Sequence, residues 1–358
     1  MRKINENGRF INKNVYFRMK LKQLQILILS IVFFAILGFA KLAFTPIYIE
    51  VPKNWPKPHY DFSKNPLTEE GFQLGRKLFY DPILSRDNTI SCSSCHLQQT
   101  GFTHVDHELS HGIDGKIGIR NSLTLQNLAW KKSFMWDGGV NHLDMQAVAP
   151  ITSPTEMDET MANIVVKLQK SERYKTLFQN AFGTNKITGQ LTLKAISQYV
   201  VSLTSNNSKY DKVIRNEEKF TVMEQNGYDL FKQNCASCHQ EPLFSSDKFE
   251  NNGLPFDPTL NDIGRMKITQ DVKDSLKFAV PTLRNIQFTF PYMHDGRLKT
   301  LNDVVKHYNS LKNNKNLPKE LSQPMHLSEN DRTDLVAFLK TLTDTKFLFN
   351  KRFAYQKE

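Results

Sequence analysis

The sequence predicts a mainly α-helical protein with two similar domains that follow an N-terminal apolar segment. All four cysteines fall in two copies of C-x-x-C-H, SCSSCH and NCASCH, and each copy follows a stretch in which apolar residues recur at helical spacing. The length of 358 residues also exceeds what one hydrophobic core usually serves. No stretch alternates apolar and polar residues for long enough to predict a sheet.

The first 45 residues are predicted to be a signal sequence or a membrane anchor. The run from Leu24 to Ala40 carries no charge and follows a leader rich in Lys and Arg. Its ending, Gly38–Ala40, fits a signal peptidase site, whereas the long basic leader favours a retained anchor. Because positive leaders stay in the cytoplasm, we expect a periplasmic body tethered to the inner membrane.

The charge does not indicate a nucleic-acid partner. The formal net charge is +11, but residues 1–45 contain eight Lys or Arg and one Glu, or +7, which leaves +4 for the rest of the chain. So small an excess lacks the basic footprint of a nucleic-acid binder. A content of 39% hydrophobic and 11% aromatic residues also excludes a disordered chain and a multi-span membrane protein.

The four cysteines indicate haem attachment. Disulfides are common in exported proteins, but here each cysteine pair is followed at once by a histidine. Zinc ribbons bring their C-x-x-C pairs within about 15–20 residues, and these pairs lie much further apart. In c-type haem attachment two thioethers hold the porphyrin, and the adjacent histidine ligates the iron. The predicted thioether residues are Cys92, Cys95, Cys235 and Cys238, and the predicted iron ligands are His96 and His239.

Helices are expected around both motifs. The stretch LTEEGFQLGRKLFYDP spaces its leucines on one face and stops at Pro82, and TVMEQNGYDLFKQN opens with the capping-box pair Thr221 and Glu224. The later stretch LNDVVKHYNSLKN is predicted to be capped by Asn302 and to turn Tyr308 inward. Other predicted helices cover residues 157–182, 191–203 and 329–342.

A helix followed by C-x-x-C-H is thus predicted twice, as in a pair of cytochrome c-like haem domains. The expected bounds are an N-terminal haem domain over residues 67–215 and a C-terminal haem domain over residues 216–345, with a proline-rich linker at 46–66 and a tail at 346–358.

Several side chains are candidates for the other side of each iron. The glycine-rich loop after His96 contains His104, His107 and His111, and such a loop can move a ligand on and off. For the second haem the usual ligand is methionine, and the candidates are Met266, Met293 and Met325. Taken alone, each of these residues also has an ordinary structural explanation, and Tyr308 taken alone is a core tyrosine.

From about Leu67 to Leu342 the chain resembles the bacterial di-haem cytochrome c peroxidase and MauG family. The resemblance rests on ordered stretches around the two motifs: LGRKLFYDPILS, RNSLTLQN, FMWDGGVNHLDMQAVAPITSPTEM, PTLRNIQFTFPYMHDG and LVAFLKTLT. It implies two cytochrome c-like domains with a calcium ion between them. It also implies that the first haem meets peroxide and the second supplies electrons.

The resemblance assigns roles by position. Trp136 matches a tryptophan between the haems, and Gln146 and Glu156 match a polar pair at the peroxide site, where a carboxylate moves a proton between the peroxide oxygens. His111 matches the histidine that blocks the first iron until the other haem is reduced. Tyr308 replaces the methionine of the peroxidases and matches the tyrosinate of MauG-type members, which lowers the potential of the iron. The matching calcium positions are Asn121, Thr289 and Pro291.

Three functions are compatible with these residues. The preferred one is a peroxidase that reduces hydrogen peroxide to water with electrons from a small cytochrome c or cupredoxin. The alternative is a MauG-like oxidase that modifies a protein side chain, which Tyr308 favours. A non-catalytic di-haem electron carrier needs both irons permanently six-coordinate. Members of the family are often homodimers, so a homodimer is a further expectation.

Overall fold

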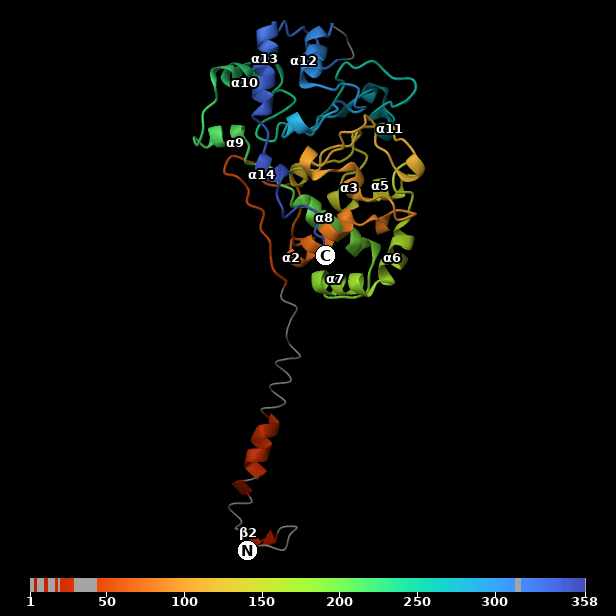
Figure 1. The fold of residues 1–358 in the computed structure, drawn as a ribbon, viewed down its shortest axis with the longest axis vertical. Coiled ribbons are helices and arrows are strands. Elements are labelled where there is room, and N and C mark those ends of the chain that lie inside the picture. The colour runs from red at the N-terminus through yellow and green to blue at the C-terminus, as the bar shows by residue number, and fades with distance from the viewer. Residues whose placement is uncertain are drawn as a thin grey trace. The chain divides into compact units, whose positions relative to one another are not determined.

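The computed structural model describes residues 3–4, 10–11, 17–18, 20–28, 44–312 and 317–357. The chain divides into two units, Met1–Phe44 and Thr45–Glu358 (Figure 1). In the first unit β1 (Lys3–Ile4) pairs antiparallel with β2 (Phe10–Ile11), and residues 20–28 are helical. Most of the predicted apolar segment, residues 29–40, lies outside the described residues. Within the described ranges, no helix combines the length and hydropathy needed to cross a membrane.

The second unit is mainly helical, as the sequence predicts. Its helices are α2 (Glu69–Tyr80), α3 (Cys92–Cys95), α4 (Leu143–Gln146), α5 (Val148–Thr152), α6 (Met161–Gln169), α7 (Glu172–Phe182), α8 (Gly189–Val201), α9 (Lys209–Ile214), α10 (Val222–Asn234), α11 (Met266–Thr269), α12 (Leu301–Ser310), α13 (Glu329–Lys340) and α14 (Thr345–Leu348). Short 3₁₀ turns occupy Pro82–Leu84, Gln98–Thr100, Ile113–Gly115, Leu128–Trp130, Val272–Asp274, Ile286–Phe288 and Lys319–Leu321. The strands β3 (Phe249–Glu250) and β4 (Phe278–Ala279) pair antiparallel.

Two hydrophobic cores organise this unit. In Figure 1 helices α2, α6, α7 and α8 lie in one group, and α10, α12 and α13 lie in another. The first group buries Phe72, Phe178 and Tyr199, and the second buries Phe231 and Phe338. Each C-x-x-C-H motif follows the first helix of its group, so each core carries one motif.

A pair of crossing helices forms the centre of each core, and the two backbones touch at a glycine. A Cβ atom added at Gly75 of α2 would lie 1.9 Å from the carbonyl oxygen of Ala195 on α8. A Cβ atom added at Gly227 of α10 would lie 1.9 Å from the carbonyl oxygen of Asp334 on α13. Both distances are far below van der Waals contact, so only glycine allows these crossings.

We expect Gly227→Ala to destabilise the protein by about 1–3 kcal/mol, because the added methyl overpacks the α10–α13 crossing against a backbone carbonyl that cannot move freely. Alanine is the better helix former by about 1 kcal/mol, so the overpacking must outweigh that gain. Urea denaturation followed by circular dichroism measures the change. Gly189→Ala is the matched control, because its added Cβ would lie 3.3 Å from the flexible Met161 side chain. Equal stability of the two variants would contradict this prediction.

The local helix signals are largely confirmed. Thr221 and Glu224 form the predicted capping box of α10, and α8 and α13 lie within two residues of their predicted bounds. The single helix predicted over residues 157–182 is wrong: it is broken into α6 and α7, because the Ser171 side chain caps α7 by accepting a hydrogen bond from the backbone of Tyr174. The predicted cap Asn302 is also wrong, because Thr300 caps α12.

The segments that the sequence analysis sets apart as linker and tail both pack on the first core. The tail contributes Phe347 and Phe353 to that core, and Tyr199 Oη donates a hydrogen bond to the Phe353 carbonyl at 2.7 Å. In the linker, Trp130 Nε1 donates to the Pro56 carbonyl at 2.8 Å. Helix α9, placed by sequence in the first domain, contributes Tyr210 to the second core. Burying these aromatic side chains removes much apolar surface from water, which stabilises the fold. They therefore pack into a core wherever they lie in the sequence.

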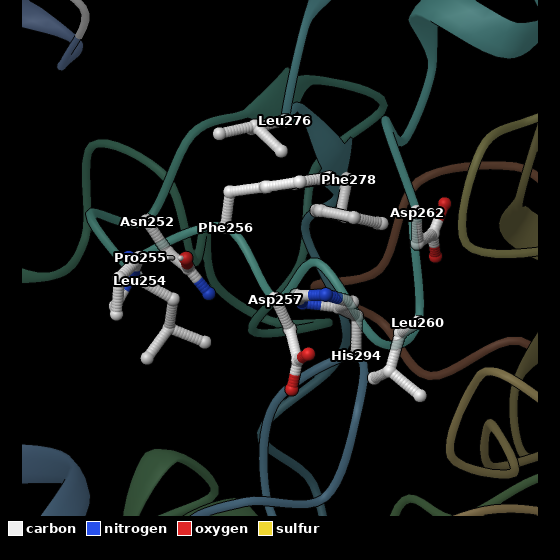
Figure 2. A pocket seen from close by; sticks show the side chains of 10 residues that line it. All are labelled: Asn252, Leu254, Pro255, Phe256, Asp257, Leu260, Asp262, Leu276, Phe278 and His294. Carbon is white, nitrogen blue, oxygen red and sulfur yellow. Dashed lines mark hydrogen bonds between the residues drawn. The ribbon is translucent and has the colours of Figure 1, made fainter.

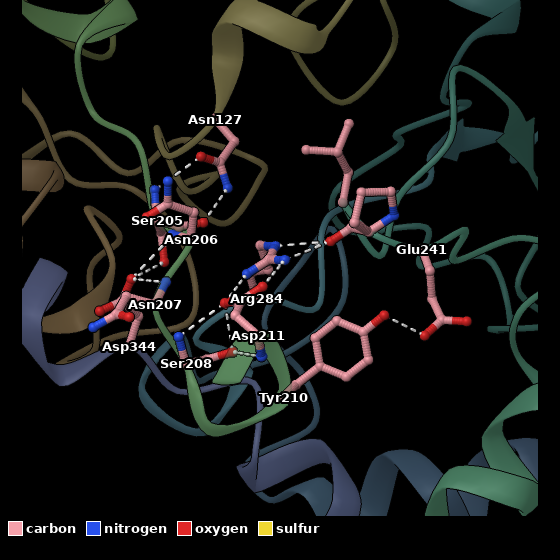
Figure 3. A network of polar contacts seen from close by, with 12 residues as sticks. Asn127, Ser205, Asn206, Asn207, Ser208, Tyr210, Asp211, Glu241, Arg284 and Asp344 are labelled. Atoms are coloured by element: carbon pink, nitrogen blue, oxygen red, sulfur yellow. Dashed lines mark hydrogen bonds and ion pairs between the residues drawn. The ribbon is translucent and has the colours of Figure 1, made fainter. Parts of the chain in front are cut away.

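A polar network fixes the segment where the chain passes from α8 to α9 (Figure 3). Arg284 is completely buried and binds Asp211 through two hydrogen bonds of 2.9 and 2.8 Å. Asp344 Oδ2 accepts hydrogen bonds from the backbone of Asn206 and Asn207 at 3.0 and 2.9 Å. These contacts tie residues far apart in the sequence into one rigid junction.

Candidate functional site

The first C-x-x-C-H motif forms one helical turn that ends at its histidine. In α3, the His96 backbone N–H donates to the Cys92 carbonyl at 3.0 Å. The His96 Nδ1 atom lies 2.8 Å from the Phe102 carbonyl. Because a carbonyl only accepts, Nδ1 carries the proton, and Nε2 keeps a free lone pair. Burial lowers the pKa of His96, which keeps the imidazole neutral and able to ligate a metal.

Beside this turn lies a cavity of about 440 Å³, a size typical of small-molecule and cofactor sites. Its lining includes Cys95, His96, Trp136, Gln146 and Glu156. Cys92 and Cys95 are free thiols, and burial raises the pKa of Cys95 to about 11. Two thiols, a neutral imidazole and a large cavity together fit a covalently attached haem.

The second motif repeats this arrangement. The His239 Nδ1 atom lies 3.1 Å from the Pro281 carbonyl and 3.3 Å from that of Phe244. Burial lowers the pKa of His239 to about 4, so its ring is neutral as well. The adjacent cavity of about 170 Å³ is lined by Cys235, Cys238 and His239, and these groups also fit a covalently attached haem.

Three of the candidate ligands for the second iron line this second cavity. They are Tyr308 on α12, Met293 and Met325. Met266, on α11, is not part of the lining. Burial raises the pKa of Tyr308, so its phenol stays protonated unless a metal displaces the proton.

The two cavities share a wall. Trp136 and the segment Ala279–Pro281 line both. Trp136 is only 8% exposed. Its Nε1 donates to the Asn121 carbonyl at 2.8 Å, and its own carbonyl accepts from the Ala279 N–H at 2.7 Å. The indole therefore has a fixed orientation between the two sites.

The predicted polar pair lies together in the first cavity. Gln146, at the end of α4, and Glu156, in the loop before α6, both line it. Burial raises the pKa of the Glu156 carboxyl. The backbone of Glu156 is held by Gly112, where a Cβ would come within 2.4 Å of the Glu156 Cα, and by the Ile113 N–H, which donates to its carbonyl at 2.8 Å.

His111, predicted to be a switchable ligand of the first iron, lies in the loop after His96. It is not among the described residues that line the first cavity. Its ring stacks on His107 with 3.8 Å between centroids, and His107 stacks on His104 at 4.1 Å. Its carbonyl accepts from Cys95 Sγ at 3.4 Å.

The predicted calcium residues offer oxygen atoms rather than acidic groups. In the described part of the chain, no cluster of three or more His, Cys, Asp or Glu side chains could hold a metal ion. Asn121 is buried, and its Nδ2 donates to the Glu108 carbonyl at 2.8 Å. Pro291 is buried and Thr289 is partly buried. A calcium ion at these positions would depend on amide, hydroxyl and carbonyl oxygens.

A small cavity lies next to the second site (Figure 2). Its volume of about 10 Å³ is close to the minimum that one water molecule requires. His294 and Phe278 line both this cavity and the second haem cavity, and their rings stack at 3.7 Å. The Nδ1 atom of His294 is buried without a hydrogen-bond partner among the described residues.

Among the residues of the first cavity that sequence reasoning missed is Lys131. Its ammonium group reaches across to the second domain and donates to Ser245 Oγ and to the Ser246 carbonyl, both at 2.9 Å. In the sequence the only signal is a Lys-Lys pair between two aromatic positions. Such a pair ordinarily indicates a solvated turn.

Comparison with known proteins decides the family. A family model described as di-haem cytochrome c peroxidase matches residues 69–219, and a cytochrome c model matches residues 224–343. The chain belongs to the di-haem cytochrome c peroxidase family. It is therefore an oxidoreductase of a di-haem peroxidase family, and its two C-x-x-C-H motifs account for two c-type haems.

Both MauG proteins and cytochrome c peroxidases are similar in sequence to this chain. The methylamine utilization protein MauG of Methylorubrum extorquens is 35% identical over 306 residues, covering 81% of this chain and 82% of the relative. The cytochrome c551 peroxidase of Nitrosomonas europaea is 32% identical over 276 residues, covering 76% and 79%. The crystal structure of a MauG-like protein associated with microbial copper homeostasis has a TM-score of 0.79 and 32% identity, and the match covers 86% of this chain and 99% of that protein.

Proposed function

We propose that the protein reduces hydrogen peroxide to water with electrons from a small cytochrome c or cupredoxin. The observation that supports this proposal most is the wall containing Trp136. It separates a larger cavity lined by Gln146 and Glu156 from a smaller cavity that neither residue lines. Such an arrangement suits division of labour, with peroxide chemistry in the first site and electron entry at the second.

Each residue has a role in this proposal. His96 and His239 ligate the irons through Nε2, and the four cysteines form thioethers. When bound, the first haem supplies the redox-active iron at which the O–O bond of peroxide is broken. Glu156 takes a proton from the near peroxide oxygen and returns it to the far one, and Gln146 orients the peroxide by hydrogen bonding. With two electrons and two protons from outside, one peroxide yields two waters.

The proposal also covers the remaining iron ligands, a calcium site and the bounds of the two domains. His111 is a switchable ligand of the first iron. Its ring must leave the stack with His107 to reach that iron. Tyr308 is the distal ligand of the second iron. A calcium ion is bound by Asn121, Thr289 and Pro291. The bounds proposed for the haem domains are residues 67–215 and 216–345.

The proposed location is the periplasm, with the N-terminal segment as a tether to the inner membrane. The basic leader and the uncharged run after it support this proposal. Membrane fractionation tests the tether, and light scattering of the purified protein tests whether it is a homodimer.

The experiment that tests the proposed function is peroxide consumption by the haem-loaded protein, with reduced cytochrome c as donor, before and after half-reduction. We expect fast turnover that oxidises two equivalents of donor for each peroxide. Activation by half-reduction would support His111 as a gate. Absence of donor-dependent turnover would refute the proposal.

A second candidate, a MauG-like oxidase that modifies a protein side chain, is favoured by Tyr308 in the second cavity. A phenolate ligand would lower the potential of the second iron and favour its oxidised states. Peroxide added without donor should then produce a near-infrared absorption band that is lost in Tyr308→Phe. Fast donor-dependent turnover without such a band identifies the peroxidase instead.

A further inference from the structure

The wall between the two cavities contains a partly buried positive charge. Lys131 belongs to the first domain and lines the first cavity, but its Nζ donates to oxygens of Ser245 and Ser246 in the second domain and lies 3.4 Å from the Val280 carbonyl. Val280 lines both cavities. The ammonium group therefore lies where the two haem sites meet.

The hydrogen-bond partners of this charge are neutral. The hydrogen bonds of Lys131 Nζ within the described chain go to one hydroxyl and two carbonyl oxygens, and none goes to a carboxylate. The nearby Asp247 is held instead by Lys132, whose Nζ lies 3.2 Å from its Oδ2. Burial lowers the pKa of Lys131 to about 8 against the opposing effect of Asp247. The group thus remains mainly protonated at pH 7, so the positive charge persists.

The contacts of Lys131 lead directly to the second proximal histidine. Its Nζ approaches the carbonyl of Val280, and the next carbonyl, that of Pro281, accepts from His239 Nδ1 at 3.1 Å. Ser245 Oγ, which accepts from Lys131, itself donates to the Val280 carbonyl at 2.8 Å.

We propose that Lys131 is a positioning residue for the second haem, whose positive charge raises that haem's midpoint potential and whose hydrogen bonds hold the Val280–Pro281 segment against His239. This inference rests on the proposed function, in which His239 ligates the second iron. A fixed cation favours the reduced iron, because the reduced site carries one positive charge fewer, and the effect is strong where water is excluded.

The charge has a specific consequence in this chain. A phenolate at Tyr308 would lower the midpoint potential of the second haem, which makes the haem harder to reduce. The positive charge of Lys131, located in the wall, raises this midpoint potential and so opposes the effect of the phenolate. The second haem then remains able to accept one electron from an external cytochrome, even with a tyrosine where a thioether is usual.

The test is a redox titration of the haem-loaded full chain, monitored by optical and electron paramagnetic resonance spectra. The second haem is identified as the one whose signal changes in Tyr308→Phe. In Lys131→Met, which keeps the length of the side chain and removes the charge, we expect a downward shift of the midpoint potential of the second haem. We expect Lys131→Arg to restore most of the wild-type value. Lys132→Met is the matched control and should leave the potential unchanged.

Lys131→Gln provides a second neutral variant that can still donate hydrogen bonds, and it is used if Lys131→Met fails to retain two haems per chain. An unchanged second-haem potential in a neutral, haem-replete variant would overturn the proposal, and so would an equal shift in Lys132→Met. A wild-type protein that consumes no peroxide would refute the proposed function alone, because the comparison of potentials does not depend on turnover.

Discussion

Glu156→Gln is expected to lower kcat/KM for peroxide by about 10²–10⁴-fold, the range by which a positioned general acid–base group accelerates a reaction. The amide keeps the shape of the side chain but cannot take up and return a proton. Glu156 is well placed for this role, because it lines the first cavity with Gln146 and its pKa is raised by burial, so that it can both release and bind a proton. The measurement is the initial rate of donor oxidation at fixed peroxide.

Haem content must be compared in the same samples, since a lost haem would also lower the rate. Glu172→Gln is a suitable control, because Glu172 is exposed at the start of α7, where its Oε1 accepts a hydrogen bond from the neighbouring Lys175 at 2.6 Å. A loss of less than threefold in Glu156→Gln, with both haems retained, would exclude Glu156 from proton transfer.

Arg284→Met should destabilise the fold by about 3–5 kcal/mol, the usual result of removing one partner from a buried ion pair. Arg284 is fully buried, and it donates to both carboxylate oxygens of Asp211 and to the Pro242 carbonyl at 2.9 and 2.7 Å. Within the described part of the chain, its loss would leave the buried Asp211 carboxylate with Ser208 as its remaining side-chain hydrogen-bond partner. Urea denaturation at pH 7 measures the effect.

Lys212→Met is the control for this change, because Lys212 forms an exposed ion pair with Glu218 and should contribute less than about 1 kcal/mol. If Arg284→Met were no more destabilising than Lys212→Met, the junction in Figure 3 would not depend on this pair.

The same pair predicts an acid sensitivity. Burial alone would raise the pKa of Asp211, but the hydrogen bonds and charge of Arg284 hold it below its ordinary value. A carboxyl whose folded pKa is depressed stabilises the fold at pH values above its unfolded pKa of about 3.9. This contribution is lost as the pH falls through the folded pKa. Unfolding measured from pH 7 to pH 2 should therefore show a smaller acid-dependent loss of stability in Asp211→Asn than in the wild type.

Much of the local structure could be read from the sequence because its causes lie within a few residues. The capping box of Thr221 and Glu224, for example, involves residues three apart. The incorrect helix predictions also have causes within a few residues. Ser171 ends one helix and starts another, and Thr300 takes the cap from Asn302, because several polar residues compete for the same unsatisfied backbone N–H groups.

The sequence by itself predicted the two haem attachment sites and determined the mainly helical class and the family. These depend on residue identity at fixed spacing. Only the tertiary structure decided that Trp136 and Val280 belong to one wall, that the His111 ring stacks on His107, and that Phe347 and Phe353 complete the first core.

Lys131 shows why some features could be found only in the tertiary structure. Its partners Ser245, Ser246 and Val280 are more than a hundred residues away in the chain, and nothing near Lys131 in the sequence specifies them. A lysine becomes a partly buried cation only when two domains close over it and supply oxygens for its protons. The burial of Lys131 depends on the packing of both cores at once, whereas a C-x-x-C-H motif consists of five consecutive residues.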